Sequence, residues 1–212
     1  MRILDTFRRA KWIVGIMLLV FLLGFGSGFA AGRLKWIDAA KVRSSKLLTL
    51  NRNLEYKVPG YGALLRKYTD WERPKLMKYI FGGEEVEAMF LIFFNNFVMA
   101  NLTMTVRAAT LVPMLLYPVG RFTQGLTMAQ TPANVRLWGT LVAEFGGYFL
   151  TICGALCLSL WTIFFRGFKF ASRREAFGSG LKFYGLMYLG SAFFLLFGAY
   201  VEMMSILAMS IR

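Results

Sequence analysis

The stretch that decides the fold is LWGTLVAEFGGYFLTICGALCLSLWTIFF, residues 137–165. It is long enough to cross a bilayer, because about 20 apolar residues span the hydrocarbon core. Glu144 is the one charged residue in it. A carboxylate inside such a segment costs roughly 2.5–3.5 kcal/mol on insertion scales, so it usually faces protein or water and not lipid. Glu202, in LLFGAYVEMMSIL (195–207), repeats this pattern, and both acids therefore mark the interior of a helix bundle.

The composition of the whole chain is that of a membrane protein. Of 212 residues, 57% are hydrophobic and 21 are Phe. A soluble domain could not cover so much apolar surface with so few charges. The net charge of +14 lies largely between or beside the apolar runs, where Lys and Arg hold loops near anionic headgroups. We therefore expect anionic lipids as partners and not nucleic acid, because the sequence has no free basic stripe with interleaved stacking aromatics.

Five apolar runs predict an all-α fold, a polytopic membrane helix bundle that forms a single domain. The runs cover residues 12–31, 88–106, 108–128, 137–165 and 183–211. Pro113 and Pro118 interrupt the third run, and proline removes backbone hydrogen bonds and kinks a helix. The polar stretch 33–87 predicts interfacial amphipathic helices over residues 34–50 and 61–81.

Basic segments predict the orientation in the cell (inner) membrane. The 166–182 loop is placed on the cytoplasmic side by Arg166, Lys169, Arg173, Arg174 and Lys182. With five spans the basic N-terminus lies on the same side. The 33–87 stretch then falls outside, against its basic content, although a segment bound to the membrane surface need not behave as a translocated loop.

Small residues at every fourth position predict close helix packing. Gly24, Gly28 and Gly32 make a groove on one face of the first span, where another helix backbone can approach. A second stripe of small residues adjoins Glu144 in the fourth span: Ala143, Gly147, Thr151 and Ala155. We therefore expect Glu144 to face protein.

Amides and carboxylates inside the apolar runs have two interpretations each. Asn95 and Asn96 fit interhelical hydrogen bonds, worth about 0.5–2 kcal/mol each, or ligands of a substrate or ion. Glu144 fits an ion pair or a carboxylate that handles protons or cations.

The ion-pair interpretation names two candidate partners. Arg107 and Arg121 are the basic residues in the middle of the apolar region. We expect one of them to pair with Glu144 and the other with Glu202. This pairing predicts that Glu144→Gln lowers thermal stability.

The sequence contains no motif of an enzyme. It has no histidine, which excludes His-ligated metals and Ser-His-Asp triads. It also has no nucleotide-binding loop, GxSxG motif or acidic cluster for Mg²⁺. Cys153 and Cys157 share a helix face as small hydrophobes, with a two-thiol metal or redox site as the alternative. We expect no catalytic residue, cofactor or metal.

Four segments carry a resemblance to a known family. They are IFFNNFVMA (92–100), PVGRFTQG (118–125), LVAEFGGYFLTICGAL (141–156) and SAFFLLFGAYVEMM (191–204), within residues 85–207. In that order they resemble the stage II sporulation protein M family of integral membrane proteins. The similar features there are an aromatic helix with a conspicuous Asn, a glycine-punctuated third span, a Glu followed by small residues, and a last helix closing on a Glu. The chain departs at Thr140-Leu141, where the family often has His-Gly, and it lacks the family's Asn-Gly in the third span.

The resemblance implies a membrane scaffold without enzymatic activity, and it makes Asn96, Glu144 and Glu202 residues of the structural core. In spore formers the family member anchors a peptidoglycan-degrading complex. Residues and resemblance together predict a non-enzymatic scaffold or accessory subunit, with other integral membrane proteins as partners in a hetero-complex or homo-oligomer. The alternatives are a transporter or permease subunit that uses the buried Glu and Asn residues, and, with least support, a membrane enzyme.

Overall fold

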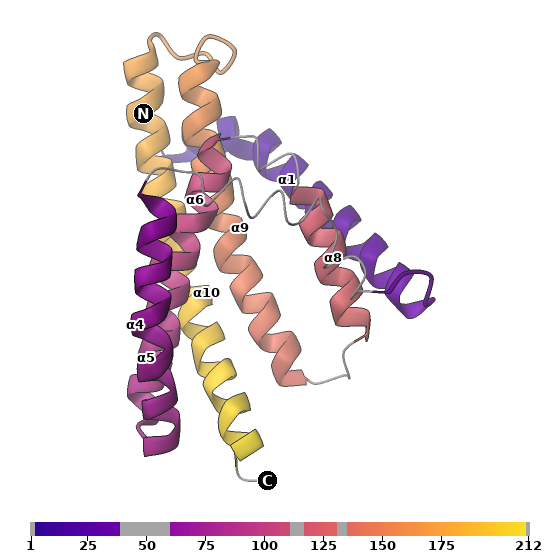
Figure 1. The fold of residues 1–212 in the computed structure, drawn as a ribbon. Coiled ribbons are helices and arrows are strands. Elements are labelled where there is room, and N and C mark those ends of the chain that lie inside the picture. Colours follow the sequence, from indigo (N-terminus) through magenta and orange to yellow (C-terminus); the bar gives the residue numbers. More distant parts are fainter. Residues whose placement is uncertain (1–2, 39–59, 111–116, 131–134, 211–212) are drawn as a thin grey trace.

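The computed structural model describes residues 3–38, 60–110, 117–130 and 135–210, and within these ranges the chain is all-α. The helices are α1 (Ile3–Arg33), α4 (Tyr61–Gly82), α5 (Glu85–Phe94), the π-helix η1 (Asn95–Ala100), α6 (Asn101–Thr110), α8 (Tyr117–Gln130), α9 (Val135–Ile163) and α10 (Arg173–Ser210). Figure 1 shows α9 and α10 as a long antiparallel hairpin, with α4, α5 and α6 on one flank and the α1–α8 pair on the other.

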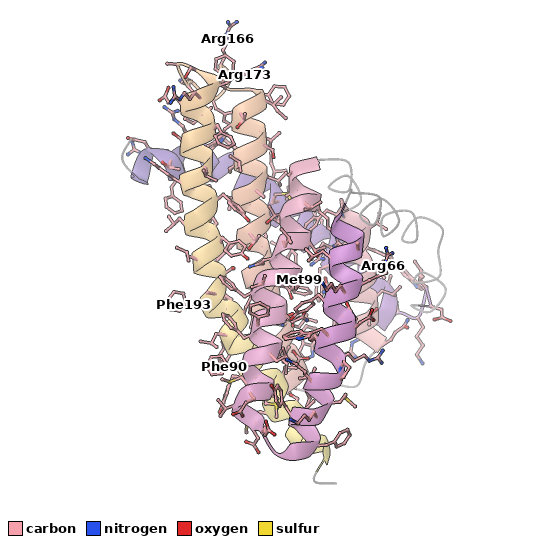
Figure 2. All side chains as sticks on the ribbon, turned by 60° about the vertical axis from the view of Figure 1, so that its left-hand side comes forward. Arg66, Phe90, Met99, Arg166, Arg173 and Phe193 are labelled. Carbon is pink, nitrogen blue, oxygen red and sulfur yellow. The ribbon has the colours of Figure 1, made fainter. Side chains whose placement is uncertain are left out.

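Four helical segments are long and apolar enough to cross a membrane, so the prediction of a multi-pass, all-α membrane protein is confirmed. These segments are Asp5–Arg33, Glu85–Ala109, Trp138–Ile163 and Arg173–Ile206. Their outer faces carry large apolar side chains, among them Phe90 and Phe193, which project away from the bundle (Figure 2). In a membrane such faces meet acyl chains.

The described residues give four candidate spans in place of the five expected. The predicted third span, 108–128, falls partly in α6, which is described up to Thr110, and partly in α8, which is described from Tyr117; residues 111–116 lie outside the described residues. α8 has 14 residues, which at about 1.5 Å per residue is shorter than a hydrocarbon core of about 30 Å. Pro118 is the second residue of α8, where the missing N–H costs little because the first turn of a helix leaves its donors unpaired.

The polar stretch 33–87 is partly described. Its first predicted amphipathic helix, residues 34–50, lies for the most part outside the described residues. The second, predicted over 61–81, is α4, which turns at Gly83 (φ 72°) and runs back as α5. Leu76, Tyr79 and Ile80 of α4 pack on an apolar cluster formed by α5 and α10. α4 therefore lies along two candidate spans and is not itself one of the four.

The second candidate span contains a π-helical turn that the sequence did not predict. α5, η1 and α6 follow one another without a break, and η1 covers Asn95–Ala100. Five residues rotate an α-helix by about 140° beyond a full turn. A π-turn is wider, with i→i+5 bonding, so it brings Asn96 and Asn101 closer to one face. Both side chains are directed at α9.

The α9–α10 hairpin is held close by interlocking glycines. A Cβ on Gly147 would approach the Leu195 side chain to 2.7 Å, and one on Gly180 would approach the Leu158 backbone to 2.8 Å. At the turn, the Glu175 N–H donates to Ser172 Oγ over 3.1 Å, so Ser172 caps the start of α10. The two helices therefore approach closely at these glycines, where a larger residue would not fit.

The α1–α8 pair is packed in the same way. A Cβ on Gly28 would overlap the carbonyl of Phe122, and a Cβ on Gly125 would overlap the carbonyl of Phe25. The two helices thus meet backbone to backbone, each through its own glycine. α1 joins the rest of the bundle through Ala10, Ile13 and Met17, which belong to the main apolar cluster with α9 and α10.

Candidate functional site

Glu144 lies in a hydrogen-bonded group of three side chains from two spans. Asn96 Nδ2 donates to Glu144 Oε1 over 3.0 Å, and the Tyr148 hydroxyl donates to Asn96 Oδ1 over 2.9 Å. Glu144 and Tyr148 are four residues apart on α9, so they share a face. The Asn96 amide therefore bridges an acceptor and a donor on one helix and joins the second candidate span to the third.

Two more carboxylates extend this group towards α10 and α4. Glu144 faces α10 beside Gly198, where an added Cβ would lie 3.6 Å from its side chain, and Glu202 follows one turn later on α10. Glu72, on α4, lies within electrostatic range of Glu202. The three acids thus form a series across three helices. The described residues contain no group of three or more His, Cys, Asp and Glu side chains arranged to hold a metal ion.

The outer end of this series lies on α4, outside the candidate spans. Partial burial raises the pKa of Glu72 above its usual range. Burial, with the nearby Glu72 charge, raises the pKa of Tyr68 to about 12. Both raised pKa values mean that the charged form of the side chain is disfavoured, as expected where water is partly excluded.

A second polar group joins three helices deeper in the bundle. Asn101 Nδ2 donates to Ser191 Oγ over 2.7 Å, and Thr151 Oγ1 donates to Asn101 Oδ1 over 2.9 Å. All three side chains are fully buried. The α6, α9 and α10 helices are therefore fixed to one another by a single amide.

Tyrosines of α10 add two further interhelical bonds. The Tyr188 hydroxyl donates to the carbonyl of Phe97 over 2.7 Å, and the hydroxyls of Tyr184 and Thr105 lie 2.8 Å apart. Four of these interhelical residues were not predicted from the sequence: Tyr148, Tyr184, Tyr188 and Ser191. The spacing of Tyr184, Tyr188 and Ser191, four and three residues apart, puts them on one helix face and was the available signal.

The arginines lie elsewhere than predicted. Glu144 accepts its hydrogen bond from an amide and not from Arg107 or Arg121. The guanidinium of Arg121 lies 4.8 Å from the ring centroid of Tyr117 and 5.2 Å from that of Phe145. Arg107 Nη1 contacts the Met104 sulfur at 3.8 Å. Arg107 belongs to α6 and Arg121 to α8, whereas the Glu144 side chain is directed at η1 and α10.

The predicted packing residues face neighbouring helices. Gly24, Gly28 and Gly32 all lie against α8. In α9, Ala143 lies against Gly198 and Gly147 against Leu195 of α10, and the side chains of Thr151 and Ala155 are buried. Asn95 is half-buried beside Asn96, and no hydrogen bond joins its side chain to another described residue.

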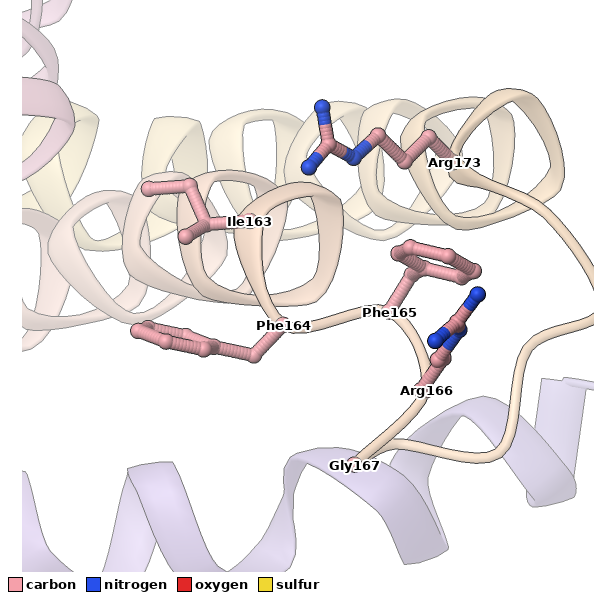
Figure 3. A pocket seen from close by; sticks show the side chains of 6 residues that line it. All are labelled: Ile163, Phe164, Phe165, Arg166, Gly167 and Arg173. Carbon is pink, nitrogen blue, oxygen red and sulfur yellow. The ribbon is translucent and has the colours of Figure 1, made fainter.

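A separate hollow lies at the turn between α9 and α10, at one end of the bundle. Arg166 and Arg173 line it together with Phe164 and Phe165 (Figure 3). It shares no residue with the polar groups described above.

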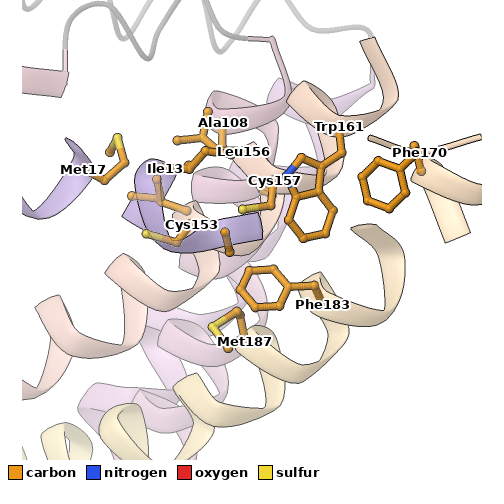
Figure 4. Close-up of a cluster of buried hydrophobic side chains, with 14 residues drawn as sticks. Ile13, Met17, Ala108, Cys153, Leu156, Cys157, Trp161, Phe170, Phe183 and Met187 are labelled. Carbon is orange, nitrogen blue, oxygen red and sulfur yellow. The ribbon is translucent and has the colours of Figure 1, made fainter. Parts of the chain in front are cut away.

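The two cysteines are free thiols inside the main apolar cluster (Figure 4). Cys153 and Cys157 are 1% and 0% exposed. Ile13 and Met17 of α1 and Phe183 of α10 belong to the same cluster. In these surroundings they act as small hydrophobic side chains.

Comparison with protein-family models, characterised proteins and solved structures gave no match. The resemblance to the stage II sporulation protein M family therefore stays a prediction that rests on its motifs.

Proposed function

We propose that this chain is a non-enzymatic scaffold or accessory subunit of a larger membrane protein complex. The observation that carries the proposal is the use of the buried polar side chains. Asn101, Thr151 and Ser191 are fully buried and hydrogen-bonded to one another across three helices. Side chains engaged in this way join helices and are not free for a substrate. The motif resemblance to stage II sporulation protein M supports the same role.

We place the contact with a lateral partner on the outer face of α1, which otherwise meets lipid. Trp12, Ile16 and Leu23 are 71%, 59% and 63% exposed, although the opposite face of the helix packs tightly on α8. Helices in lipid associate through shape and small residues and not through hydrophobicity alone. The α1–α8 pair, which diverges from the α9–α10 hairpin in Figure 1, offers such a shape to a neighbouring membrane protein.

The proposed location is the cell (inner) membrane, with the N-terminus and the 166–182 loop in the cytoplasm. The Arg9 guanidinium lies 4.2 Å from the ring centroid of Phe170, and the rings of Phe7 and Phe183 are 5.4 Å apart. The start of α1 and the basic turn therefore occupy the same end of the bundle. Basic residues concentrated at one end favour the cytoplasmic side.

Purification from native membrane tests the scaffold. In a mild detergent the chain should elute in a larger complex, and a harsh detergent should convert it to a smaller species. Co-expression of two differently tagged copies separates a homo-oligomer, in which one tag recovers the other, from a hetero-complex. A homogeneous monomer with full thermal stability in the mild detergent would contradict the proposal.

A transporter or permease subunit is the second candidate. The observation that favours it is the placement of Glu72, Glu202 and Glu144 on three helices, with Glu144 facing α10 beside Gly198, one turn before Glu202. Such acids can carry protons or cations through a membrane interior. The test is proton or cation flux into proteoliposomes by the wild type, Glu144→Gln and Glu202→Gln. Flux that survives both changes would remove these carboxylates from any transport mechanism.

A further inference from the structure

The hollow at the α9–α10 turn combines two guanidinium groups with an apolar shelf. It has a volume of about 570 Å³. Its lining residues come from the end of α9, the turn and the first residue of α10: Ile163, Phe164, Phe165, Arg166, Gly167 and Arg173. Figure 3 shows the hollow beside the neighbouring helix α1.

The guanidinium groups of Arg166 and Arg173 both lie near the ring of Phe165. The Cζ atoms of Arg166 and Arg173 lie 5.6 and 5.8 Å from the ring centroid of Phe165. Neither guanidinium forms an ion pair with a carboxylate among the described residues. Glu175, the acid nearest to them in sequence, instead accepts a hydrogen bond from the Ala171 N–H over 2.8 Å at Oε2. Two cations therefore line the hollow with the Phe165 ring between them (Figure 3), and neither is paired with a described carboxylate.

The start of α10 adds to this positive potential. Arg173 is the first residue of a 38-residue helix. The positive end of the helix dipole lies at this turn, although Ser172 already accepts the N–H of Glu175. An anion placed in the hollow would thus be attracted chiefly by the two arginine side chains.

The apolar shelf lies where the candidate span ends. Trp138–Ile163 is the apolar segment, and its last residue, Ile163, is 49% exposed while Phe164 is 58% exposed. In a bilayer these side chains meet acyl chains. Arg166 follows within one helical turn and so comes to the level of the lipid phosphates, where basic residues bind anionic headgroups.

We propose that this hollow is a binding site for an anionic phospholipid, with the phosphate held by Arg166 and Arg173 and an acyl chain lying on Ile163 and Phe164. Guanidinium groups match phosphate oxygens with two parallel hydrogen bonds each. A zwitterionic lipid presents the same phosphate with a compensating cation, which the two arginines repel. Basic loops are attracted to anionic headgroups in general, whereas this proposal places a single lipid molecule at defined residues.

Lipid retention by the full-length protein tests the proposal. The purified chain in mild detergent is titrated with dioleoyl phosphatidylglycerol or with dioleoyl phosphatidylcholine, and bound lipid is counted by native mass spectrometry. We compare the wild type with R166Q/R173Q. The matched control, R66Q/R73Q, removes two exposed arginines of α4 and so has the same net charge. Phe164→Ser removes the larger side chain of the shelf, keeps Ile163 and leaves both charges.

We expect the wild type to prefer phosphatidylglycerol and R166Q/R173Q to bind it about tenfold or more weakly, the change that one hydrogen bond to a charged group corresponds to. The control pair should change binding less than about twofold, and Phe164→Ser should weaken binding of both lipids. Equal binding of the two lipids by the wild type, or undiminished phosphatidylglycerol binding by R166Q/R173Q, would overturn the site.

A competition experiment identifies the source of the phosphate. Glycerol phosphate carries the same charged group without acyl chains. If it displaces phosphatidylglycerol at equal concentration and Phe164→Ser has no effect, the hollow binds a soluble phosphate and the lipid assignment is wrong. Displacement only at a large excess supports the lipid.

Discussion

Asn96 donates a hydrogen bond to Glu144 over 3.0 Å, and this bond joins the second candidate span to the third. A neutral amide is thus the partner of the carboxylate that stands alone in its apolar segment. The amide oxygen of Asn96 in turn accepts from Tyr148. This arrangement changes what substitution of Glu144 is expected to do.

Glu144→Gln should keep the thermal stability of the protein close to that of the wild type. The glutamine carbonyl can accept the same bond from Asn96, and the repulsion between Glu144 and Glu202 disappears. Glu144→Leu should destabilise by about 1–3 kcal/mol, because it leaves the Asn96 N–H unpaired. Thermal unfolding in detergent measures both. A loss with glutamine as large as the loss with leucine would restore the ion-pair interpretation, because either change would leave a buried arginine without its anion.

Asn101→Ala should destabilise the bundle more than Asn95→Ala. Asn101 is fully buried and bonded to Ser191 and Thr151, so its removal takes two interhelical bonds, worth about 0.6–1.7 kcal/mol each in membranes. Asn95, in the same span, makes no side-chain hydrogen bond to a described residue and serves as the matched control. Thermal unfolding curves of the two variants in the same detergent compare their loss of stability. Equal losses would contradict the assigned role of Asn101.

Gly28→Ala should separate α1 from α8, whereas Gly26→Ala should not. A Cβ on Gly28 overlaps the Phe122 carbonyl, while a Cβ on Gly26 has nothing within 4 Å. Overpacking of this kind costs about 1–3 kcal/mol, and alanine at an open helical position stabilises by about 0.5–1 kcal/mol over glycine. Melting temperatures and limited proteolysis of both variants provide the measurement. Equal loss at the two positions would mean that α8 does not approach this face of α1.

Glu72→Gln should stabilise the protein near neutral pH and have little effect in acid. Burial raises the pKa of Glu72, so the folded protein holds this proton more tightly than the unfolded chain does. The folded state is therefore favoured by this group below the unfolded pKa, and the advantage is lost as pH rises through the folded pKa. Its nearby titratable groups are Tyr68 on α4 and Glu202 on α10.

Melting temperatures of the wild type and Glu72→Gln between pH 4 and pH 8 test this sign. Asp70→Asn, at an exposed position of the same helix, is the control for loss of one negative charge. A difference between Glu72→Gln and the wild type that grows towards acid would contradict the burial of this carboxyl.

The second span shows why the polar contacts could not be read from the sequence. Asn96 and Asn101 were visible as amides in an apolar run, and interhelical hydrogen bonding was one of two interpretations. Which helix each amide reaches depends on the rotation of the span, and the π-turn of η1 changes that rotation between them. The local pattern of apolar residues does not predict a π-turn, in which one helical turn contains an additional residue. The arginine partners predicted for Glu144 were wrong because the rotation of α9 turns Glu144 towards Asn96, whereas Arg121 lies on α8 beside Tyr117 and Phe145.

The sequence by itself determined that the chain is an all-α, multi-pass membrane protein, because the free energy of transfer into lipid is a sum over consecutive residues. It also determined which faces pack closely, since a spacing of four puts Gly24, Gly28 and Gly32 on one side of α1. Only the tertiary structure decided that α8 is a short helix against α1, that Asn96 holds Glu144, and that Arg166 and Arg173 share one ring. Some of these contacts join residues far apart in the chain, and the last joins residues across a turn. All depend on the register and rotation of the helices, which only the packing of the whole bundle fixes.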